Sequence, residues 1–422
     1  MKSTDYTLQS SYTLQRCNEC HTLTGIAINL TDHTACCPNC NAVLQAAHRW
    51  SLKRCTIIAV SILILLPFAL LFPLMSIDLL GVKIHASVWE GVWKMATAGF
   101  PYTAFMILLC SVIMPFAFVL LVITLGIQKW FDHRPYYSLR LLGKIKQWVM
   151  LDVYLVALAV AAFKVREYAS LEFDIYLLPF VLTTLLTTLL FIKIDTKQLW
   201  KTFYPEYSEY TEISLNHASN LALCHECGYT FEPSIAKEKG KEPTHCPRCT
   251  SKLNISDNIK LQRVWATLIA GTIMMFPANI LPISSTEFAG TTSADSLISG
   301  VLLFLEMGSY TVAAIVFIAS IAVPVSKIAV ILYLLLAIHY QWKHNIHWQM
   351  KLLHYVHFVG RWSMLDLFVL ALMMSLVERG QIINFSVGDA AFYFGAAVFL
   401  TMIASTNLDA KMLWKIHQNR IK

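Results

Sequence analysis

The sequence lacks the charge of a soluble protein. Asp, Glu, Lys and Arg make up only 14% of its 422 residues, compared with about 25% in ordinary globular domains. Hydrophobic residues make up 56%, and the mean hydropathy is +0.56. This balance excludes a soluble globular protein of ordinary composition and predicts a chain that crosses a membrane several times.

Familiar catalytic signatures are also absent. The chain has no GxxxxGK(S/T) phosphate-binding loop, no GxGxxG fingerprint and no nucleophile elbow, so nucleotide hydrolysis and dinucleotide chemistry are not predicted. We expect a protein that is not an enzyme. A cleavable signal peptide is missing as well, because the first fifty residues are polar and have Cys17, Cys20, Cys37 and Cys40 where its apolar core would lie. The amino terminus is therefore expected in the cytoplasm.

Cysteine, by contrast, is concentrated in CxxC pairs. Eight of the eleven cysteines form two sets of four, with sixteen and eighteen residues between the pairs. The sets are Cys17, Cys20, Cys37 and Cys40, and Cys224, Cys227, Cys246 and Cys249. Four thiolates on two facing turns predict one structural zinc ion per set, in a zinc ribbon kept in a reducing compartment. Rubredoxin-like iron and a redox dithiol are the alternatives.

Eight apolar segments are candidates for membrane helices. They cover residues 55–75, 100–127, 147–163, 175–194, 264–283, 310–338, 362–377 and 390–406. The loop 128–146 carries five basic residues and one acid, and the loop 339–361 carries lysine, arginine and five histidines with no acid. The loop 284–309 has three acids and no basic residue. Because positive residues favour the cytoplasmic side, both ribbons and both termini are predicted there.

The chain also contains an internal repeat. Cys246 and Pro324 follow Cys37 and Pro115 at one constant offset in residue number, and Asp366 follows Asp152 at a second, slightly larger offset. An even number of spans per unit makes this a parallel repeat. We predict an all-α polytopic membrane protein of two tandem repeats. Its domains are a zinc ribbon at 1–50, a four-span unit at 51–200, a second ribbon at 201–260, and a second four-span unit with a basic tail at 261–422.

Two aspartates and a lysine stand farther than a residue or two from the ends of the apolar segments, where a charge costs at least about 2.5–3.5 kcal/mol. They are Asp152, Asp366 and Lys327, and the position matching Lys327 in the first half is Phe118. We predict a functional polar network in the second half, with Asp152 as the structural counterpart of Asp366. Its members are Lys327, Asp366, Ser320, Ser326, Ser363 and Thr401. The alternatives are a structural ion pair of Lys327 with Asp366, or side chains that reach the membrane surface.

The paired segments KQWVMLDVYLVAL and GRWSMLDLFVLAL, each in a four-span unit behind a double CxxC ribbon, resemble the PqiA/LetA family of bacterial inner-membrane proteins. The resemblance extends from Cys17 to Trp414. It implies a multi-pass protein of the inner membrane with its ribbons in the cytoplasm, working beside a periplasmic, oligomeric MCE-domain protein that forms a tunnel toward the outer membrane. One departure is His21, which stands after Cys20 where the second ribbon has a glycine.

The resemblance therefore implies transport of phospholipid between the inner membrane and the MCE tunnel, and we expect the second four-span unit to handle the lipid. Nucleic acid is not an expected partner. A small-solute or ion transporter and a passive platform that anchors a periplasmic partner are the alternatives. A membrane thiol oxidoreductase is disfavoured, because all four CxxC pairs are predicted to bind metal.

Overall fold

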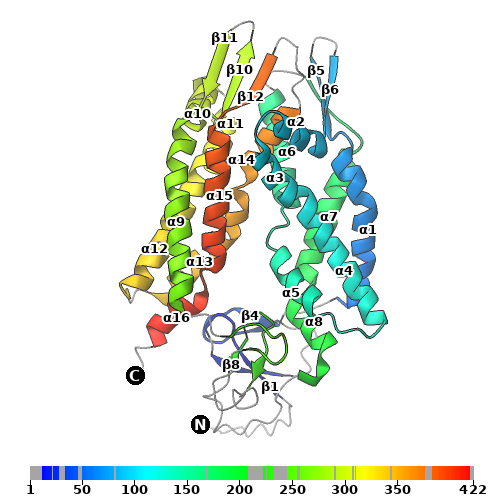
Figure 1. The fold of residues 1–422 in the computed structure, drawn as a ribbon, viewed down its shortest axis with the longest axis vertical. Helices are drawn as coiled ribbons and strands as arrows, with labels where there is room; N and C mark the ends of the chain where they lie inside the picture. The colour runs from blue at the N-terminus through cyan, green and yellow to red at the C-terminus, as the bar shows by residue number, and fades with distance from the viewer. Residues whose placement is uncertain are drawn as a thin grey trace, which may run out of the picture.

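The computed structural model describes residues 12–20, 22–27, 34–45, 50–79, 82–166, 170–207, 222–224, 226–231, 245–253, 257–288, 291–306, 308, 310–342, 345–375 and 383–418. Most of these residues are helical. Strands of two small modules lie at one end of the helical body, and further short strands lie at the other end (Figure 1). We call the modules ribbon 1 (residues 12–45) and ribbon 2 (222–253), and the helical parts the first half (51–207) and the second half (257–418).

Ribbon 1 contains β1 (Tyr12–Arg16), β2 (Leu23–Ala27), β3 (Ala35–Cys36) and β4 (Val43–Gln45). The first half contains α1 (Leu52–Leu71), β5 (Met75–Leu79), β6 (Val82–Ala86), α2 (Val88–Thr97), α3 (Pro101–Leu108), the π-helical turn η1 (Leu109–Ile113), α4 (Met114–Trp130), α5 (Tyr136–Ile145), α6 (Leu151–Arg166), β7 (Ser170–Phe173), α7 (Leu177–Lys193), α8 (Thr196–Phe203) and the short 3₁₀ turn η2 (Pro205–Tyr207).

Ribbon 2 contains β8 (Ala222–Leu223) and β9 (Thr230–Phe231). The second half follows nearly the same order of elements. It contains α9 (Asp257–Ile280), β10 (Ser284–Phe288), β11 (Thr291–Asp295), α10 (Leu297–Glu306), α11 (Tyr310–Phe317), the π-helical turn η5 (Ile318–Ala322), α12 (Val323–His339), α13 (Ile346–Trp362), α14 (Leu365–Ser375), β12 (Ile383–Val387), α15 (Ala390–Asn407) and α16 (Ala410–Gln418).

The fold is mainly helical, as predicted, but it is not wholly α. In each half a central strand pairs antiparallel with its hairpin partner and with a strand from much later in the chain, giving the orders β6-β5-β7 and β11-β10-β12. Of these segments, the sequence predicted a loop for 284–309, which contains β10 and β11. The strands β5, β6 and β12 alternate apolar and polar residues, a strand pattern that the prediction did not use. The pairing of β5 and β10 with strands from much later in the chain cannot be seen in the sequence.

Five helical stretches among the described residues are long and apolar enough to cross a membrane, and the bent pair of α7 and α8 makes a sixth. They cover residues 52–71, 101–130, 313–339, 346–375 and 390–407. The stretch 346–375 differs from the prediction, which placed 339–361 in a loop. Residues 346–362 form the helix α13, whose buried apolar face includes Met350, Leu353, Val356 and Val359. The chain is therefore a multi-pass membrane protein, and the count of eight spans stays a prediction.

The two halves meet where α6 packs on α14, near the middle of the molecule (Figure 1). Each of these helices begins at the leucine of its WxMLD segment. The rings of Tyr154 and Phe368, which occupy matching positions of the repeat, contact each other with 5.2 Å between centroids. Within each half the first helix packs along the last long one, α1 along α7 and α9 along α15.

Candidate functional site

The eight paired cysteines form two compact groups of sulfur atoms, one in each ribbon. Within each group all four Sγ atoms lie within 4.8 Å of one another. Opposite Sγ atoms are 3.5 Å apart for Cys17 and Cys40 and 3.4 Å apart for Cys224 and Cys249. A tetrahedral zinc ion with Zn–S distances of about 2.3 Å would hold its sulfurs about 3.8 Å apart. Both groups therefore fit a four-coordinate metal ion.

Tight backbone turns orient these cysteines. Gly228 and Thr250, each just after a CxxC pair, have positive φ angles of 71° and 48° and donate backbone N–H bonds to the carbonyls of Cys224 and Cys246. In ribbon 1, burial would raise the pKa of Cys37, but backbone N–H groups that donate to its sulfur outweigh burial and lower the pKa to about 7. His21, the departure noted in the sequence, lies outside the described residues.

Ribbon 2 packs against the first half. Thr250 donates a 2.8 Å hydrogen bond to the hydroxyl of Tyr136 on α5, and the Arg248 guanidinium lies 5.8 Å from the ring centroid of Trp200 on α8. Buried Phe231 belongs to the same apolar cluster as Trp200. Ribbon 2 therefore packs on the first half, which precedes it in the chain, at the end that is predicted to face the cytoplasm.

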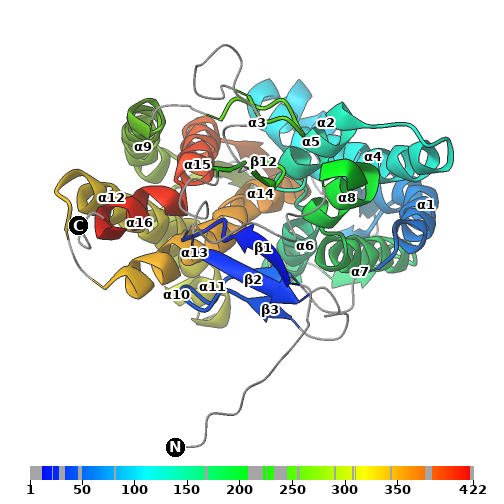
Figure 2. The same ribbon diagram turned by 90° about the horizontal axis from the view of Figure 1, so that it is seen from below.

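Ribbon 1 packs against the second half, which is the farther half in sequence. Its buried Ile26 and Leu44 share one apolar cluster with Leu334 of α12, Met350 of α13 and Leu413 of α16. Seen from below, its strands lie beneath the middle of the molecule (Figure 2). The two ribbons also touch, because the backbone N–H of Arg16 donates to the Thr230 hydroxyl at 3.2 Å. The ribbons therefore link the two halves in a crossed arrangement.

Lys327, the central residue of the predicted network, is fully buried on α12. Its Nζ has no hydrogen-bond partner among the described residues. A methyl group placed on Gly360 of α13 would lie 3.6 Å from Lys327 Nζ and 3.8 Å from Ser405 Oγ of α15, so three helices meet around this ammonium. Burying such a charge without a partner costs several kcal/mol. Hydrogen bonds of the described chain do not compensate it.

The first half places a different lysine at its matching helix junction. Lys146, at the end of α5, donates to the carbonyl oxygens of Phe191 (2.8 Å) and Ile194 (3.2 Å) at the end of α7. A cation is stabilised at this end of a helix. Burial lowers the pKa of Lys146, and the Asp195 carboxylate opposes that shift. Lys146 is therefore a structural cation with two carbonyl partners.

Three matched positions differ together between the halves. By the two offsets of the repeat, Gly360 corresponds to Lys146, Ser405 to Phe191 and Lys327 to Phe118. In the first half the Phe118 and Phe191 rings pack with 4.7 Å between centroids. In the second half the aromatic pair is replaced by Lys327 and Ser405, and the structural lysine by glycine. The sequence predicted Lys327, whereas this exchange becomes visible only when the second offset of the repeat is applied to Gly360 and Ser405.

The other predicted polar residues occupy several environments. The hydroxyls of Ser320 and Ser363 are buried and have no hydrogen-bond partner among the described residues. Ser326 donates to the Val323 carbonyl at 2.9 Å and shares a 3.2 Å hydrogen bond with Tyr355 of α13. Thr401 donates to the Val398 carbonyl, and its methyl group packs where a side chain on Gly271 of α9 would lie.

The two aspartates lie at helix starts rather than within continuous helices. Asp366 is buried and Asp152 half-buried, and each stands in the first turn of its helix, α14 and α6. Helical structure is interrupted just before each aspartate, at Ser363 and Met364 in the second half. A carboxylate is favoured at a helix N-terminus by the helix dipole. The structure thus gives both aspartates a local stabilisation, and the pairing of Asp366 with Lys327 stays a prediction.

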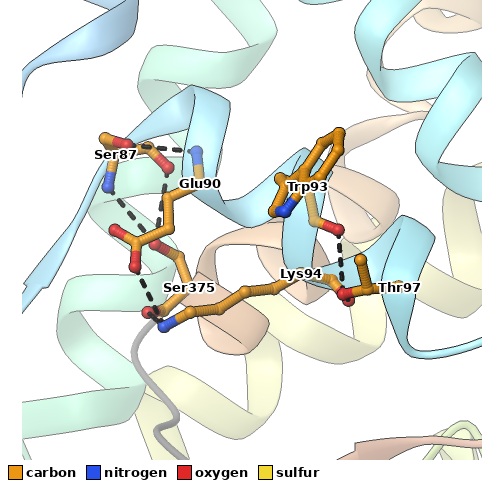
Figure 3. Close-up of polar contacts among 6 residues, drawn as sticks. All are labelled: Ser87, Glu90, Trp93, Lys94, Thr97 and Ser375. Carbon is orange, nitrogen blue, oxygen red and sulfur yellow. Dashed lines mark hydrogen bonds and ion pairs between the residues drawn. The ribbon is translucent and has the colours of Figure 1, made fainter.

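A polar latch joins α2 to the end of α14 (Figure 3). The Ser375 hydroxyl accepts a 3.2 Å hydrogen bond from the backbone N–H of Ser87, and Lys94 Nζ donates to the Ser375 carbonyl at 2.9 Å. Lys94 also forms a 3.1 Å ion pair with Glu90. Beneath this latch, a methyl group on Gly91 would lie only 2.5 Å from the Ala371 carbonyl oxygen, so α2 and α14 are in close backbone contact.

The matching helix of the second half, α10, lacks this contact. Lys94 is replaced by Leu303 and Ser375 by Ala161. Around Gly300, which corresponds to Gly91, no described atom lies within 4 Å of the place a side chain would take. An apolar groove of about 520 Å³ lies between α10 and α11. The second half is therefore open at the position where the first half is closed.

Comparison with known proteins supports these observations. The sequence profile of the family described as "Paraquat-inducible protein A" matches residues 52–204 and 261–418. A Haemophilus influenzae protein named "Probable intermembrane transport protein" is 56% identical over 408 residues, covering 96% of this chain and 97% of that protein. The Escherichia coli protein named "Lipophilic envelope-spanning tunnel protein A" is 38% identical, covering 96% and 92%. Another E. coli protein, "Intermembrane transport protein PqiA", is 28% identical, covering 94% of each chain. No solved structure matches the chain.

Proposed function

Because this chain belongs to the family of paraquat-inducible protein A, we propose that it is the inner-membrane component of a lipid transport system. It passes phospholipid between the inner membrane and a periplasmic MCE-protein tunnel that leads toward the outer membrane. The names of two relatives, an intermembrane transport protein and an envelope-spanning tunnel protein, support this function. The second half is the part that handles the lipid.

The observation that carries this assignment is the unpartnered ammonium of Lys327. At the matching helix junction of the first half, Lys146 has two carbonyl partners, so a lysine that only stabilises such a junction can have its hydrogen bonds satisfied by the chain. A phospholipid phosphate would supply the missing charge-assisted hydrogen bonds to Lys327. The buried hydroxyls of Ser320 and Ser363, together with Ser326, Thr401 and Asp366, would form the polar surroundings of the head group.

The ribbons complete the proposal. Each four-cysteine group holds one zinc ion, which fixes a small cytoplasmic module that would not fold without metal. Both termini lie in the cytoplasm, and the two halves form a parallel repeat of four spans each. The domain limits 1–50, 51–200, 201–260 and 261–422 follow from this organisation. The crossed ribbons then hold the cytoplasmic ends of the two halves together.

The test compares Lys327→Met with the control Phe118→Leu at the matching position. Each variant would be the only copy in cells, and outer-membrane integrity would be measured as resistance to detergent. We expect the Lys327→Met protein to reach the membrane in normal amount and to fail in this assay, while the control supports growth. A normal envelope with Lys327→Met would contradict the lipid-handling role and favour a passive platform.

A separate measurement addresses the alternative of a small-solute or ion transporter. The purified protein would be placed in vesicles of phosphatidylethanolamine and phosphatidylglycerol without any periplasmic partner, and ion and solute fluxes would be recorded. We expect no flux above that of empty vesicles. Flux that depends on Lys327 would replace the lipid transport proposal with a solute transporter.

A further inference from the structure

The groove between α10 and α11 is the most distinctive apolar feature that the polar network does not use. Its walls include Val301, Leu302 and Leu305 from α10, and Ala313, Phe317 and Ile321 from α11 and η5. No charged side chain lines it among the described residues. Val301 and Ala313 are buried at its base, with 8% and 1% of their surface exposed. It is therefore a groove with an apolar floor rather than a flat surface.

We propose that this groove binds one acyl chain of the phospholipid that the second half handles, an inference that rests on the proposed function. Leu302, Leu305 and Phe317 on its rim are exposed, and Phe317 belongs to 313–339, one of the helical stretches long and apolar enough to cross a membrane. In a bilayer the medium around such side chains is hydrocarbon, not water. An apolar cavity of about 150 Å³ holds a benzene molecule, so the 520 Å³ groove has room for a considerably longer hydrocarbon.

The position of the groove along the chain favours an amphipathic ligand. Ile321 at its end follows directly after Ser320, whose buried hydroxyl has no hydrogen-bond partner among the described residues. Lys327 lies six residues farther along the same continuous helix, a rise of about 9 Å. An apolar site thus ends where unsatisfied polar groups begin. A phospholipid, with its chain in the groove and its head group toward these polar groups, matches both parts.

The first half explains why only one groove is used. There α2 is held on α14 by the Ser375 latch and by the close approach at Gly91. In the second half α10 has no such latch, and the surroundings of Gly300 are open. The matching positions also differ in size, because Ala314 in the groove corresponds to Phe105 in the first half. Among the described residues, the groove therefore belongs to the half that carries Lys327.

The test uses a phospholipid with a photoactivatable group in its acyl chain, mixed into vesicles of phosphatidylethanolamine and phosphatidylglycerol that contain the full-length protein. After illumination, mass spectrometry would locate the labelled residues. We expect the strongest labelling at Val301 and Ala313, above that of exposed membrane-facing residues such as Phe276. Labelling of the groove no stronger than that of Phe276 would show bulk lipid only and would overturn the proposal.

Ala313→Trp would fill the groove, with Val325→Trp as a control on an exposed position of α12. We expect labelling of Val301 to fall about tenfold with Ala313→Trp, which corresponds to about 1.4 kcal/mol of lost affinity, and to stay unchanged with Val325→Trp. If Ala313→Trp does not fold, Val301→Phe serves in its place, with the labelling read at Ala313. Unchanged labelling in a folded variant would overturn the proposal. The proposed function can fail separately from the groove. In that case cells with the Lys327→Met protein keep a normal envelope, although the groove of that protein is still labelled.

Discussion

The helices α2 and α10 occupy matching places in the two halves but have different surroundings. A methyl group on Gly91 of α2 would lie 2.5 Å from the Ala371 carbonyl oxygen, whereas one on Gly300 of α10 would meet no described atom within 4 Å. The lysines at the two helix junctions also differ in their hydrogen-bond partners. Lys146 donates to two carbonyls, whereas Lys327 has no hydrogen-bond partner among the described residues.

The difference indicates a division of labour. Lys146 in the first half has two carbonyl partners, and α2 is packed closely on α14, as expected for a scaffold. In the second half the buried ammonium of Lys327 has no hydrogen-bond partner among the described residues, and α10 lacks the close contact that α2 makes with α14. A buried charge without a partner costs stability unless a ligand compensates it. This difference between matched positions favours the second half as the functional one.

The largest expected effect comes from metal removal, and it tests how each ribbon supports the half it contacts. Cys224→Ser with Cys249→Ser should remove one zinc ion per chain and unfold ribbon 2, because zinc binding contributes about 10–16 kcal/mol in small zinc modules. Hydrogen exchange should then increase at α5 and α8 of the first half. The matched pair Cys17→Ser with Cys40→Ser should instead increase exchange at α13 and α16. The same exchange pattern from both pairs would contradict the crossed arrangement.

The two lysines should respond in opposite ways to removal of their charge. Lys146→Met should destabilise the protein by about 2–4 kcal/mol, because it removes two hydrogen bonds made by a charged donor. Lys327→Met should leave stability unchanged or raise it by about 1–4 kcal/mol, since a buried charge is replaced by an apolar side chain. Thermal unfolding of both variants in the same detergent gives the comparison. Equal destabilisation would show that Lys327 is a structural cation as well.

Gly91 and Gly300 allow the same substitution in both halves. Gly91→Ala should cost about 1–3 kcal/mol, because the added methyl would overlap the backbone of α14 and push α2 away. Gly300→Ala should be neutral or stabilise α10 by up to about 1 kcal/mol through its higher helix propensity. The shift in unfolding temperature measures both. Equal losses would mean that α10 packs as closely as α2.

The smallest expected effect concerns the latch at the end of α14. Ser375→Ala removes the hydrogen bond from the Ser87 N–H and should cost about 1 kcal/mol. The loss should appear as faster hydrogen exchange at the start of α2, with α10 unaffected. Ala161→Ser, which introduces the hydroxyl at the matching place in the second half, should leave exchange in α10 unchanged because Leu303 cannot complete a latch. Protection of α10 by Ala161→Ser would show that it already lies close to α6.

The sequence predicted the parts of this account that are set by local spacing. The CxxC pairs identified both four-cysteine groups, and Lys327 stood out as a lysine in an apolar segment. The Lys146 and Gly360 exchange was missed because it depends on side chains that reach one point from different helices. Asp152 and Asp366 were predicted near the starts of their spans, and the structure places each in the first turn of its helix. Finally, 284–309 was predicted as a loop, whereas it contains β10, β11 and α10, and the pairing of β10 with the distant β12 cannot be seen in the sequence.

The central claim is that the second half, and not the first, contacts lipid at its helix junction. The most direct measurement is photo-crosslinking in cells, with a photoreactive amino acid placed at Ile328, beside Lys327, and at the matching Val119, beside Phe118. We predict phospholipid adducts at position 328 and none at 119. Lipid adducts of equal yield at both positions, or at neither, would contradict the account.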